Sequence, residues 1–483
     1  MHITSLANPY GIGSMGKCAY DFVDFLCKAG QSYWQILPLS PTGYGDSPYQ
    51  AFSTFAGNPY LIDLDILIES GLLKQEEVDA VCWSRDECRV DYGCLYANRI
   101  RLLRHAFERF CPDAAFYAFL EDNADWLEDF ALFMALKEKF SGNNWQSWPL
   151  NLRLRDPATI ARCRAELEHT IRFYSFLQFT FFQQWQALRG YANQKGIRII
   201  GDVPIYVPLD SADVWSNPGL FQLDENGRPK RVAGCPPDSF TADGQLWGNP
   251  LYDWDKMKAT GFSWWIHRLS AASGMYDVVR LDHFRGFESY WSVPAEDKTA
   301  VGGCWMPGPG SAFVQAIQSA LPNLEFIAED LGYVTPEVRQ LQEESGYPGM
   351  KVLQFAFDSR ETGDYLPHTY PVNSVCYTGT HDNLTMAQWF REAAPEDIAM
   401  AKAYLGLNGE EGLVQGMIRG SMGSVSKLCV IQMQDYLELG SSARMNFPGT
   451  LSANNWTWRV EKDAVTEHLA KHIYSITRRY GRL

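Results

Sequence analysis

The chain lacks the residue patterns that hold structural metals and disulfides. Its 11 cysteines are an odd number, and none of them forms a Cys-x-x-Cys pair. Its nine histidines form no His-Glu-x-x-His motif or similar spacing of metal ligands. We therefore expect neither a disulfide framework nor a zinc site, and the free thiols indicate a reducing compartment.

The chain also lacks membrane and targeting signals, and it is poor in positive charge. No stretch is apolar enough to span a bilayer, and the first residues show no basic region followed by an apolar core. Lys and Arg number 42 against 57 Asp and Glu, so the net charge is −15. Such a protein repels phosphate backbones and anionic membranes. We expect a cytoplasmic protein that binds neither nucleic acid nor membrane and takes a neutral or cationic substrate.

Apolar material is plentiful. Hydrophobic residues make up 46% of the 483 residues. The 16 Trp, 24 Tyr and 27 Phe could offer flat faces to sugar rings, although most of them are expected in the core. Apolar runs alternate with helical patterns, which is typical of a parallel α/β fold. The predicted strands are His2–Leu6, Tyr33–Leu37, Ile197–Val203, Tyr276–Asp282, Leu324–Glu329, Lys351–Phe357, Ser374–Thr378 and Leu428–Met433.

Eight strand–helix units favour a closed (β/α)8 TIM barrel, a single catalytic domain over residues 1–483, rather than an open sheet. The helix before the second strand is predicted from Lys17 to Ala29, with Gly30 ending it. Two insertions are too long for loops. Residues 57–194, between strands two and three, have a helical pattern and predict a helical subdomain. Residues 204–262, between strands three and four, are rich in Gly, Pro, Asp and Trp and predict an irregular lid over a site.

A glycine-rich turn near the start matches the dinucleotide-binding fingerprint. The turn is Gly11-Ile-Gly13-Ser-Met-Gly16, and a helical pattern follows it. The fingerprint also requires an acidic residue at the end of the next strand, where this chain has Leu37-Pro38-Leu39. The glycines are better explained as a tight turn into the helix, and no nucleotide cofactor is expected.

Three carboxylates end or follow three of the apolar runs. Asp282 ends the fourth predicted strand, Glu329 ends the fifth, and Asp382 follows the seventh. A buried charge is costly unless it is paired, and the carboxyl ends of barrel strands are where catalytic groups collect. Carboxylates converging on one point are what breaking a glycosidic bond requires.

Each carboxylate has a functional and a structural interpretation. Arg280 points to the same side of its strand as Asp282 and would hold it ionised, as a nucleophile needs, but the two could also be a purely structural pair. The apolar residues before Glu329 would raise its pKa, as a general acid needs. His381 and Asp382 could grip neighbouring sugar hydroxyls, while Asn383 is as readily explained by an Asx turn capping the next helix.

These residues and their surroundings resemble one family. Arg-x-Asp on the fourth strand, Glu on the fifth and His-Asp on the seventh resemble the order of the α-amylase clan. Other segments, from residue 2 to beyond 458, resemble the 4-α-glucanotransferases called amylomaltase or disproportionating enzyme, glycoside hydrolase family 77. They are Pro41-Thr-Gly-Tyr44-Gly-Asp46-Ser-Pro48-Tyr49, Gly201-Asp202-Val-Pro-Ile-Tyr, Pro236-Pro237-Asp238 through Trp247-Gly-Asn249-Pro250, and Arg444-Met-Asn446 with Pro448-Gly449.

The resemblance implies a role for each matching residue. Asp282 would be the nucleophile, Glu329 the general acid/base and Asp382 the stabiliser of the transition state. The other residues would bind the glucan: the transferred sugar at Tyr49, Asp202, Arg280 and His381; the acceptor side at Phe240, Trp247 and Asn249; a cleft-lining loop at Asn446 and Pro448; and a second patch outside the cleft at Tyr44. Tyr44 is equally well explained as a surface turn aromatic.

Two departures from the family pattern are visible. Ser239 stands where some members have the first of two aromatic residues, so one stacking face for the acceptor is missing. Ser14 stands where an Asp is common, which we interpret as a change of helix cap. The first departure concerns acceptor length and the ratio of transfer to hydrolysis, not the chemistry.

The expected reaction moves α-1,4-glucan segments from a maltodextrin donor to another glucan or to glucose, with no metal or organic cofactor. Retaining carboxylates of this kind lie about 5–5.5 Å apart, and the intermediate is covalent. If water takes the place of the acceptor, the protein is a hydrolase, which would produce new reducing ends. A non-catalytic glucan-binding protein is a further alternative, against which the joint presence of Arg280 and the three carboxylates argues. The sequence leaves the oligomeric state open.

Overall fold

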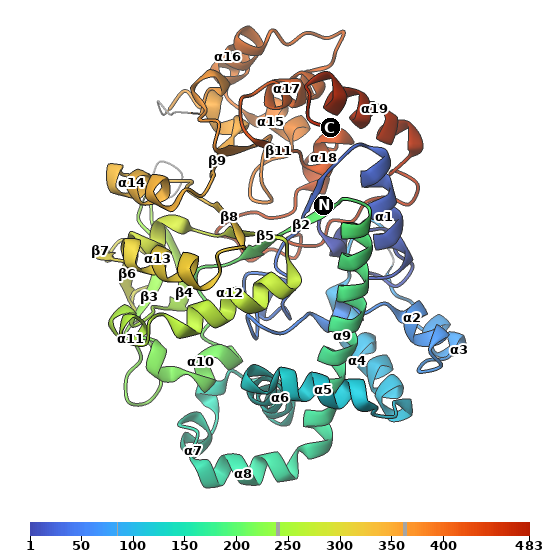
Figure 1. The fold of residues 1–483 in the computed structure, drawn as a ribbon, viewed down its shortest axis with the longest axis vertical. Coiled ribbons are helices and arrows are strands. Elements are labelled where there is room, and N and C mark those ends of the chain that lie inside the picture. The colour runs from blue at the N-terminus through green and yellow to red at the C-terminus, as the bar shows by residue number, and fades with distance from the viewer. Residues whose placement is uncertain (85, 238–241, 361–364) are drawn as a thin grey trace.

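Seven parallel strands form the centre of the molecule. The structure is a computed structural model that describes residues 1–84, 86–237, 242–360 and 365–483. Neighbouring strands are parallel throughout, in the order β1-β2-β5-β8-β9-β10-β11. Figure 1 shows helices surrounding them. The strands are β1 (Tyr33–Gln35), β2 (Arg198–Val203), β5 (Val278–Leu281), β8 (Glu325–Ala328), β9 (Gly349–Val352), β10 (Ser374–Tyr377) and β11 (Leu428–Val430).

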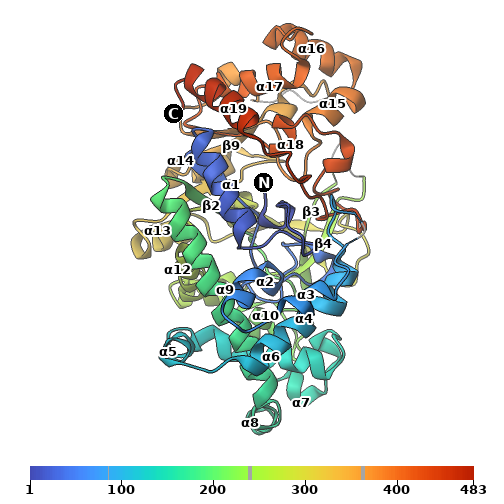
Figure 2. The ribbon, with the colours of Figure 1, turned by 90° about the vertical axis from the view of Figure 1, so that its right-hand side faces the viewer.

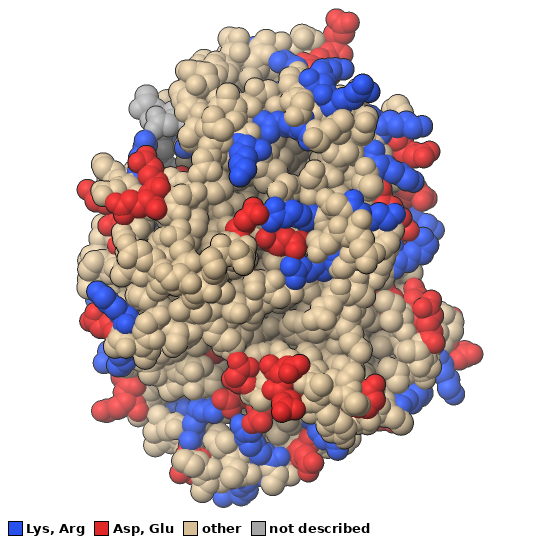
Figure 3. Space-filling model, in the orientation of Figure 1, with Lys and Arg blue, Asp and Glu red and all other residues tan. Residues whose placement is uncertain are grey.

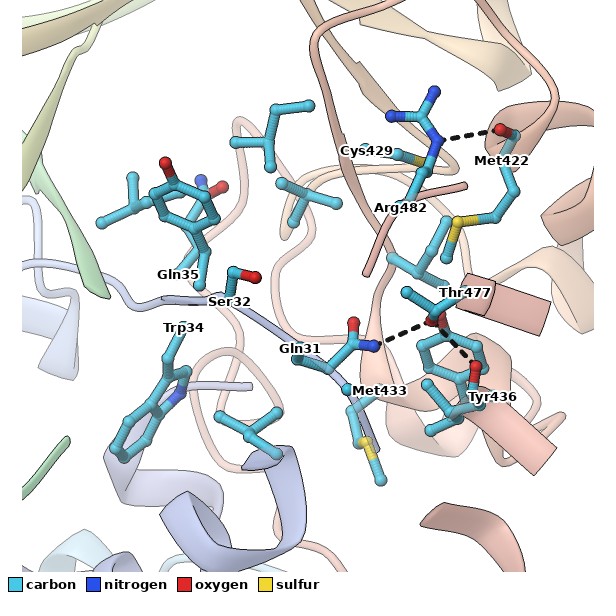
Figure 4. Close-up of a pocket in the computed structure, with 18 of the residues that line it drawn as sticks. Gln31, Ser32, Trp34, Gln35, Met422, Cys429, Met433, Tyr436, Thr477 and Arg482 are labelled. Atoms are coloured by element: carbon cyan, nitrogen blue, oxygen red, sulfur yellow. Dashed lines mark hydrogen bonds between the residues drawn. The ribbon is translucent and has the colours of Figure 1, made fainter. Parts of the chain in front are cut away.

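The predicted parallel barrel is confirmed, but the sheet has seven strands and is nearly closed rather than closed. The prediction of a strand at His2–Leu6 is wrong, because Ile3–Ser5 is a turn of 3-10 helix. The backbone N–H of Leu37 donates to the His2 ring at 3.2 Å instead of to a strand. A cavity of about 370 Å³ separates β1 from β11, with Trp34 and Gln35 on one side and Cys429 on the other (Figure 4). A short apolar run does not distinguish a strand from a buried turn.

Most residues on both faces of β2, β5, β8, β9 and β10 are buried, which explains the continuous apolar runs of these strands. One set of side chains packs together inside the barrel: Ile200, Val278, Ile327, Met350, Val352, Val375 and Tyr377. The alternate residues, such as Ile199 and Val279, pack in the larger core shared with the outer helices. The first of these helices is α1 (Lys17–Lys28), as predicted, with Gly30 in the left-handed conformation just beyond it.

Helices occupy the chain between β1 and β2. The last of them, α9, is 27 residues long and lies beside β2, while α5 to α8 lie farthest from the strands, at the bottom of Figure 1 and again in Figure 2. They are α2 (Leu64–Glu69), α3 (Gln75–Asp79), α4 (Tyr92–Arg109), α5 (Ala114–Asp122), α6 (Ala124–Lys139), α7 (Leu150–Arg153), α8 (Pro157–Glu166) and α9 (Glu168–Gln194).

A second, antiparallel sheet stands beside the barrel. Its order is β4-β3-β6-β7, so residues 204–262, predicted to be irregular, contribute two paired strands. We call it the side sheet. It consists of β3 (Arg231–Cys235), β4 (Gln245–Pro250), β6 (Ser289–Pro294) and β7 (Cys304–Pro307), and the helices that flank it in sequence are α10 (Ala212–Ser216), α11 (Trp254–Ala259), α12 (Ser263–Met275) and α13 (Gly310–Ala320).

The remaining helices follow the later barrel strands. They are α14 (Pro336–Ser345), α15 (Met386–Glu392), α16 (Pro395–Leu405), α17 (Leu413–Met422), α18 (Met433–Tyr436) and α19 (Glu467–Arg479). Within the described ranges, no helix combines the length and apolar character needed to cross a bilayer. On the face shown in Figure 3, basic and acidic side chains are interspersed, so the excess of negative charge does not form one broad patch there.

Close packing inside the fold depends on a glycine in β2. A Cβ built on Gly201 would lie 2.1 Å from the ring of Tyr276, which is buried. We predict that Gly201→Ala lowers the free energy of unfolding by about 1–3 kcal/mol, the usual cost of overpacking a core. The measurement is the denaturant midpoint, followed by circular dichroism.

The matched control is Gly190→Ala in α9, where nothing lies within 4 Å of the added Cβ. Alanine favours helix over glycine by about 1 kcal/mol, so this variant should be as stable as the parent or more stable. Equal midpoints for the two variants would contradict the packing argument.

Candidate active site

Three polar residues continue the interior rows of the barrel at the carboxyl ends of its strands. Because side chains alternate along a strand, Asp202 follows Ile200, Arg280 follows Val278 and Glu329 follows Ile327 on the inward side. The register of the strands also brings these groups together, because Asp202 of β2 is paired with Arg280 of β5. The apolar runs that build the barrel therefore deliver these groups to one place.

Arg280 connects the acidic groups. Its Nη1 donates to both oxygens of Asp202, at 2.8 and 2.7 Å, and to Asp282 at 3.1 Å. Its Nη2 lies 3.9 Å from Glu329 Oε2. Arg280 is only 5% exposed, so a single buried guanidinium faces three carboxyl groups.

Glu329 is positioned by the backbone of two loops. The N–H of His283 donates to Oε2 at 2.6 Å, and the N–H of Leu331 donates to Oε1 at 3.0 Å. His283 adopts a left-handed conformation with φ of 49°. Few non-glycine residues adopt this conformation, and its occurrence beside a carboxylate is typical of functional sites.

Burial and charge act in opposite directions on the two neighbouring carboxyls. Burial raises the pKa of Asp282 well above its usual value, and Arg280 opposes the rise. Burial also raises the pKa of Glu329, against the lowering effects of Arg280 and the two backbone donors. Asp282 and Glu329 thus lie beside the same buried cation, and in both residues burial raises the pKa while Arg280 lowers it.

An aromatic wall adjoins Asp202. The Tyr49 hydroxyl donates to Asp202 at 2.6 Å, and the Tyr49 ring stacks on His381 with centroids 5.1 Å apart. Trp456 packs against both rings, at 5.8 and 5.7 Å. Burial lowers the pKa of His381, so its imidazole is neutral at neutral pH and can donate to or accept from a sugar hydroxyl.

Asp382 lies outside the buried cluster and is more exposed to solvent than the other carboxyls. Its side chain is 47% exposed and lies 3.4 Å from His381 Nε2. Asn446 donates to its carboxylate at 2.6 Å, and Arg444 donates to its carbonyl oxygen at 2.8 Å. The loop that carries Asn446 therefore orients Asp382, while Asn383 bonds to the backbone and hydroxyl of Thr380.

The structure describes three of the remaining predicted binding residues. Trp247, on β4, meets the His283 ring edge-on at 4.9 Å, which brings the side sheet to the acidic cluster. Asn249 is buried on the same strand, and Pro448 is exposed. Phe240 and the side chain of Tyr44 lie outside the described part of the chain.

Sequence reasoning did not single out three residues of the site. Trp456 completes the aromatic wall, Arg444 holds the backbone of Asp382, and the backbone of His283 positions Glu329. Arg444 lies in a motif that carries the family resemblance, so it could have been proposed. The other two could not be found from local sequence. His283 acts through its backbone N–H, and Trp456 lies 407 residues after Tyr49 in the chain.

A parallel barrel with acidic groups held around a buried arginine at its carboxyl rim is the arrangement of a glycoside-processing enzyme. The model of glycoside hydrolase family 77, described as 4-alpha-glucanotransferase, matches residues 1–465. The chain therefore belongs to the 4-alpha-glucanotransferase family, enzymes that act on α-1,4-glucans.

Individual relatives agree over nearly the whole chain. The 4-alpha-glucanotransferase of Clostridium butyricum is 48% identical over 100% of both chains. That of Thermus thermophilus is 50% identical over 95% of this chain and 93% of its own. The amylomaltase of Streptococcus agalactiae, solved in complex with acarbose, is 40% identical and superposes with a TM-score of 0.97, covering 100% of this chain and 98% of its own.

The Arg280 cluster yields a prediction about pH. Arg280 lowers the pKa values of both Asp282 and Glu329, so Arg280→Gln should raise both. The acid and alkaline limbs of the kcat/KM profile should then both move to higher pH, with a loss of about 10²–10³-fold at the optimum. The measurement is the pH dependence of initial rates on a maltodextrin.

Arg198→Gln is the control for this variant. Arg198 pairs with Glu325 at 2.8 Å near the other end of the strands, and both side chains are partly exposed. Its profile should match that of the parent. An Arg280→Gln profile with unmoved limbs would show that the guanidinium does not set the ionisation of the pair.

Proposed function

We propose that the chain transfers α-1,4-glucan segments by double displacement through a covalent intermediate on Asp282. The observation that carries the proposal is the buried guanidinium of Arg280, which contacts Asp282 at 3.1 Å and lies 3.9 Å from Glu329. In this proposal the guanidinium stabilises Asp282 as a carboxylate beside Glu329 as a carboxylic acid. A nucleophile and an acid are the two groups that retaining cleavage requires.

In the first step Glu329 is the acid and Asp282 the nucleophile. The reaction proceeds from the state in which the proton is on Glu329 and Asp282 is ionised. Glu329 protonates the leaving oxygen while Asp282 attacks the anomeric carbon, so the glycosidic bond breaks as the ester to Asp282 forms. Glu329 is then a carboxylate, ready to act as the base of the second step.

The second step reverses these roles. Glu329 removes the proton from the 4-hydroxyl of an incoming glucan, or of glucose, and that oxygen attacks the anomeric carbon while the bond from this carbon to the Asp282 carboxylate breaks. A new α-1,4 bond forms and Asp282 is released as a carboxylate. Because each displacement inverts the anomeric carbon, the product keeps the α configuration.

Residues around the cluster would hold the transferred sugar. In this proposal the ring of the transferred sugar packs against Tyr49, and Arg280, Asp202 and His381 bind the hydroxyls of the same sugar. Asp382, partly exposed and oriented by Asn446, would bind ring hydroxyls more strongly as the sugar flattens toward the transition state. Such differential binding, rather than tight binding of the substrate, accelerates the reaction.

The choice between transfer and hydrolysis would depend on residues 204–262 as a lid on the acceptor side. Trp247 reaches His283, next to the acidic cluster, and with Asn249 and Phe240 would favour a glucan over water. Excluding water protects a reactive ester from hydrolysis. Residues 57–194 would form the helical subdomain, Pro448 a rim contact and Tyr44 a second glucan contact.

Incubation with maltotriose tests the proposal. We expect free glucose and a ladder of longer maltooligosaccharides, while the total number of reducing ends stays constant, because each transfer breaks one bond and makes another. The measurement combines chromatography of chain lengths with a reducing-end assay. A steady rise in reducing ends without longer products would make the chain a hydrolase.

Asp282→Asn tests the nucleophile within the same assay. The amide cannot form the glycosyl ester, so turnover should fall at least about 10⁴-fold, by analogy with other catalytic nucleophiles, while maltotriose still binds. Asp330→Asn is the neighbouring control, since Asp330 accepts from the Met350 backbone and lies outside the proposed machinery. Activity in Asp282→Asn equal to that of the parent would rule out the assignment.

A further inference from the structure

Two exposed aromatic rings stand beside the active site and have no role in the chemistry above. Trp305, on β7, is 36% exposed, and Tyr333, in the loop after β8, is 68% exposed. Trp305 is the one exposed tryptophan in the described part of the chain. Large aromatic rings in water have a free-energy cost, and paired exposed rings are typical of binding surfaces.

The rings form a fixed surface rather than two loose side chains. Their centroids are 6.4 Å apart and their planes differ by 22°, so they lie nearly parallel. Trp305 also meets the edge of Trp291, on β6, at 5.1 Å. We call Trp305 and Tyr333 the aromatic platform.

A buried arginine supports the platform from behind. The Arg285 guanidinium lies 3.7 Å over the Trp305 ring and 6.0 Å over the Tyr333 ring. It donates to the Tyr333 carbonyl at 2.9 Å and to Ser289 Oγ at 2.7 Å. Arg285 is 2% exposed, and its Nε has no hydrogen-bond partner within the described structure. The hydrogen bonds fix the position of the Arg285 guanidinium, and its cation–π contacts in turn fix the positions of the two rings.

Chain connections place the platform close to the proposed acid/base. Tyr333 follows Glu329 by four residues, which can span at most about 14 Å, and Leu331 between them donates to Glu329. Arg285 is two residues from His283, whose ring meets Trp247. Trp305 lies on the edge strand β7 of the side sheet, and Trp247 lies on the opposite edge strand, β4. The loop after β8, which carries Tyr333, thus connects the platform directly to Glu329.

We propose that the aromatic platform binds glucose rings of the acceptor glucan, several units beyond the bond being formed. The flat C–H face of a glucose ring packs on an aromatic face, and its hydroxyls remain in water at the rim. The platform would select long acceptors over glucose, which is too short to reach it. This inference rests on the proposed function, because it assumes that a glucan is the acceptor.

The test compares acceptors of different length. In Trp305→Ala and in Tyr333→Ala, KM for maltoheptaose as acceptor should rise about five- to tenfold more than KM for glucose, the loss expected for one stacking contact. Trp305→Phe keeps a ring and should recover most of the loss. Tyr117→Ala, which removes an aromatic residue that is 55% exposed on α5, is the matched control and should change neither constant.

Two results would overturn the platform. One is an equal rise in both constants, which indicates a distorted site; the other is no rise in either. Calorimetry with maltoheptaose in an Asp282→Asn background separates this inference from the proposed function. If glucan binding weakens with Trp305→Ala while the parent enzyme only hydrolyses, the platform binds glucan and the transferase proposal fails.

Discussion

The site depends on one charge imbalance. A single buried guanidinium, that of Arg280, faces the carboxyls of Asp202, Asp282 and Glu329. Burial favours the neutral forms of Asp282 and Glu329, and the guanidinium opposes this effect. The proposed mechanism starts with one proton in the cluster, on Glu329. The proposed acid of the first step and base of the second are the same group before and after it gives up that proton.

The barrel brings the groups of this cluster together because the carboxyl ends of its strands meet at one rim. The same alternation that packs Ile200, Val278 and Ile327 inside the barrel carries the next inward residue of each strand into the site. Arg280 and the two proposed catalytic carboxyls lie at the ends of rigid strands, whereas the residues proposed to bind the acceptor lie on loops and on the side sheet. In this proposal the acceptor specificity can change without a change in the chemistry.

Much of this arrangement could be predicted from the sequence. Parallel strands buried on both faces have distinct apolar runs, and a carboxylate at the end of such a run is conspicuous. The barrel and the positions of Asp282 and Glu329 could therefore be predicted. The structure of His2–Leu6 could not be predicted, because its apolar residues fit a buried turn as well as a strand. The role of Trp456, the backbone donor at His283 and the pairing of Trp305 with Tyr333 depend on contacts between distant segments, which no local pattern records.

The most direct measurement is the mass of the protein during the reaction. Glu329→Gln keeps the nucleophile and removes the acid/base, so a donor with a good leaving group, α-maltotriosyl fluoride, should still react while the second step is slow. Intact mass spectrometry should then show one added maltotriosyl group, and peptide mapping should place it on Asp282. The Asp282→Asn, Glu329→Gln double variant should gain nothing. A label on another residue, or an unlabelled variant that consumes the fluoride, would contradict the account.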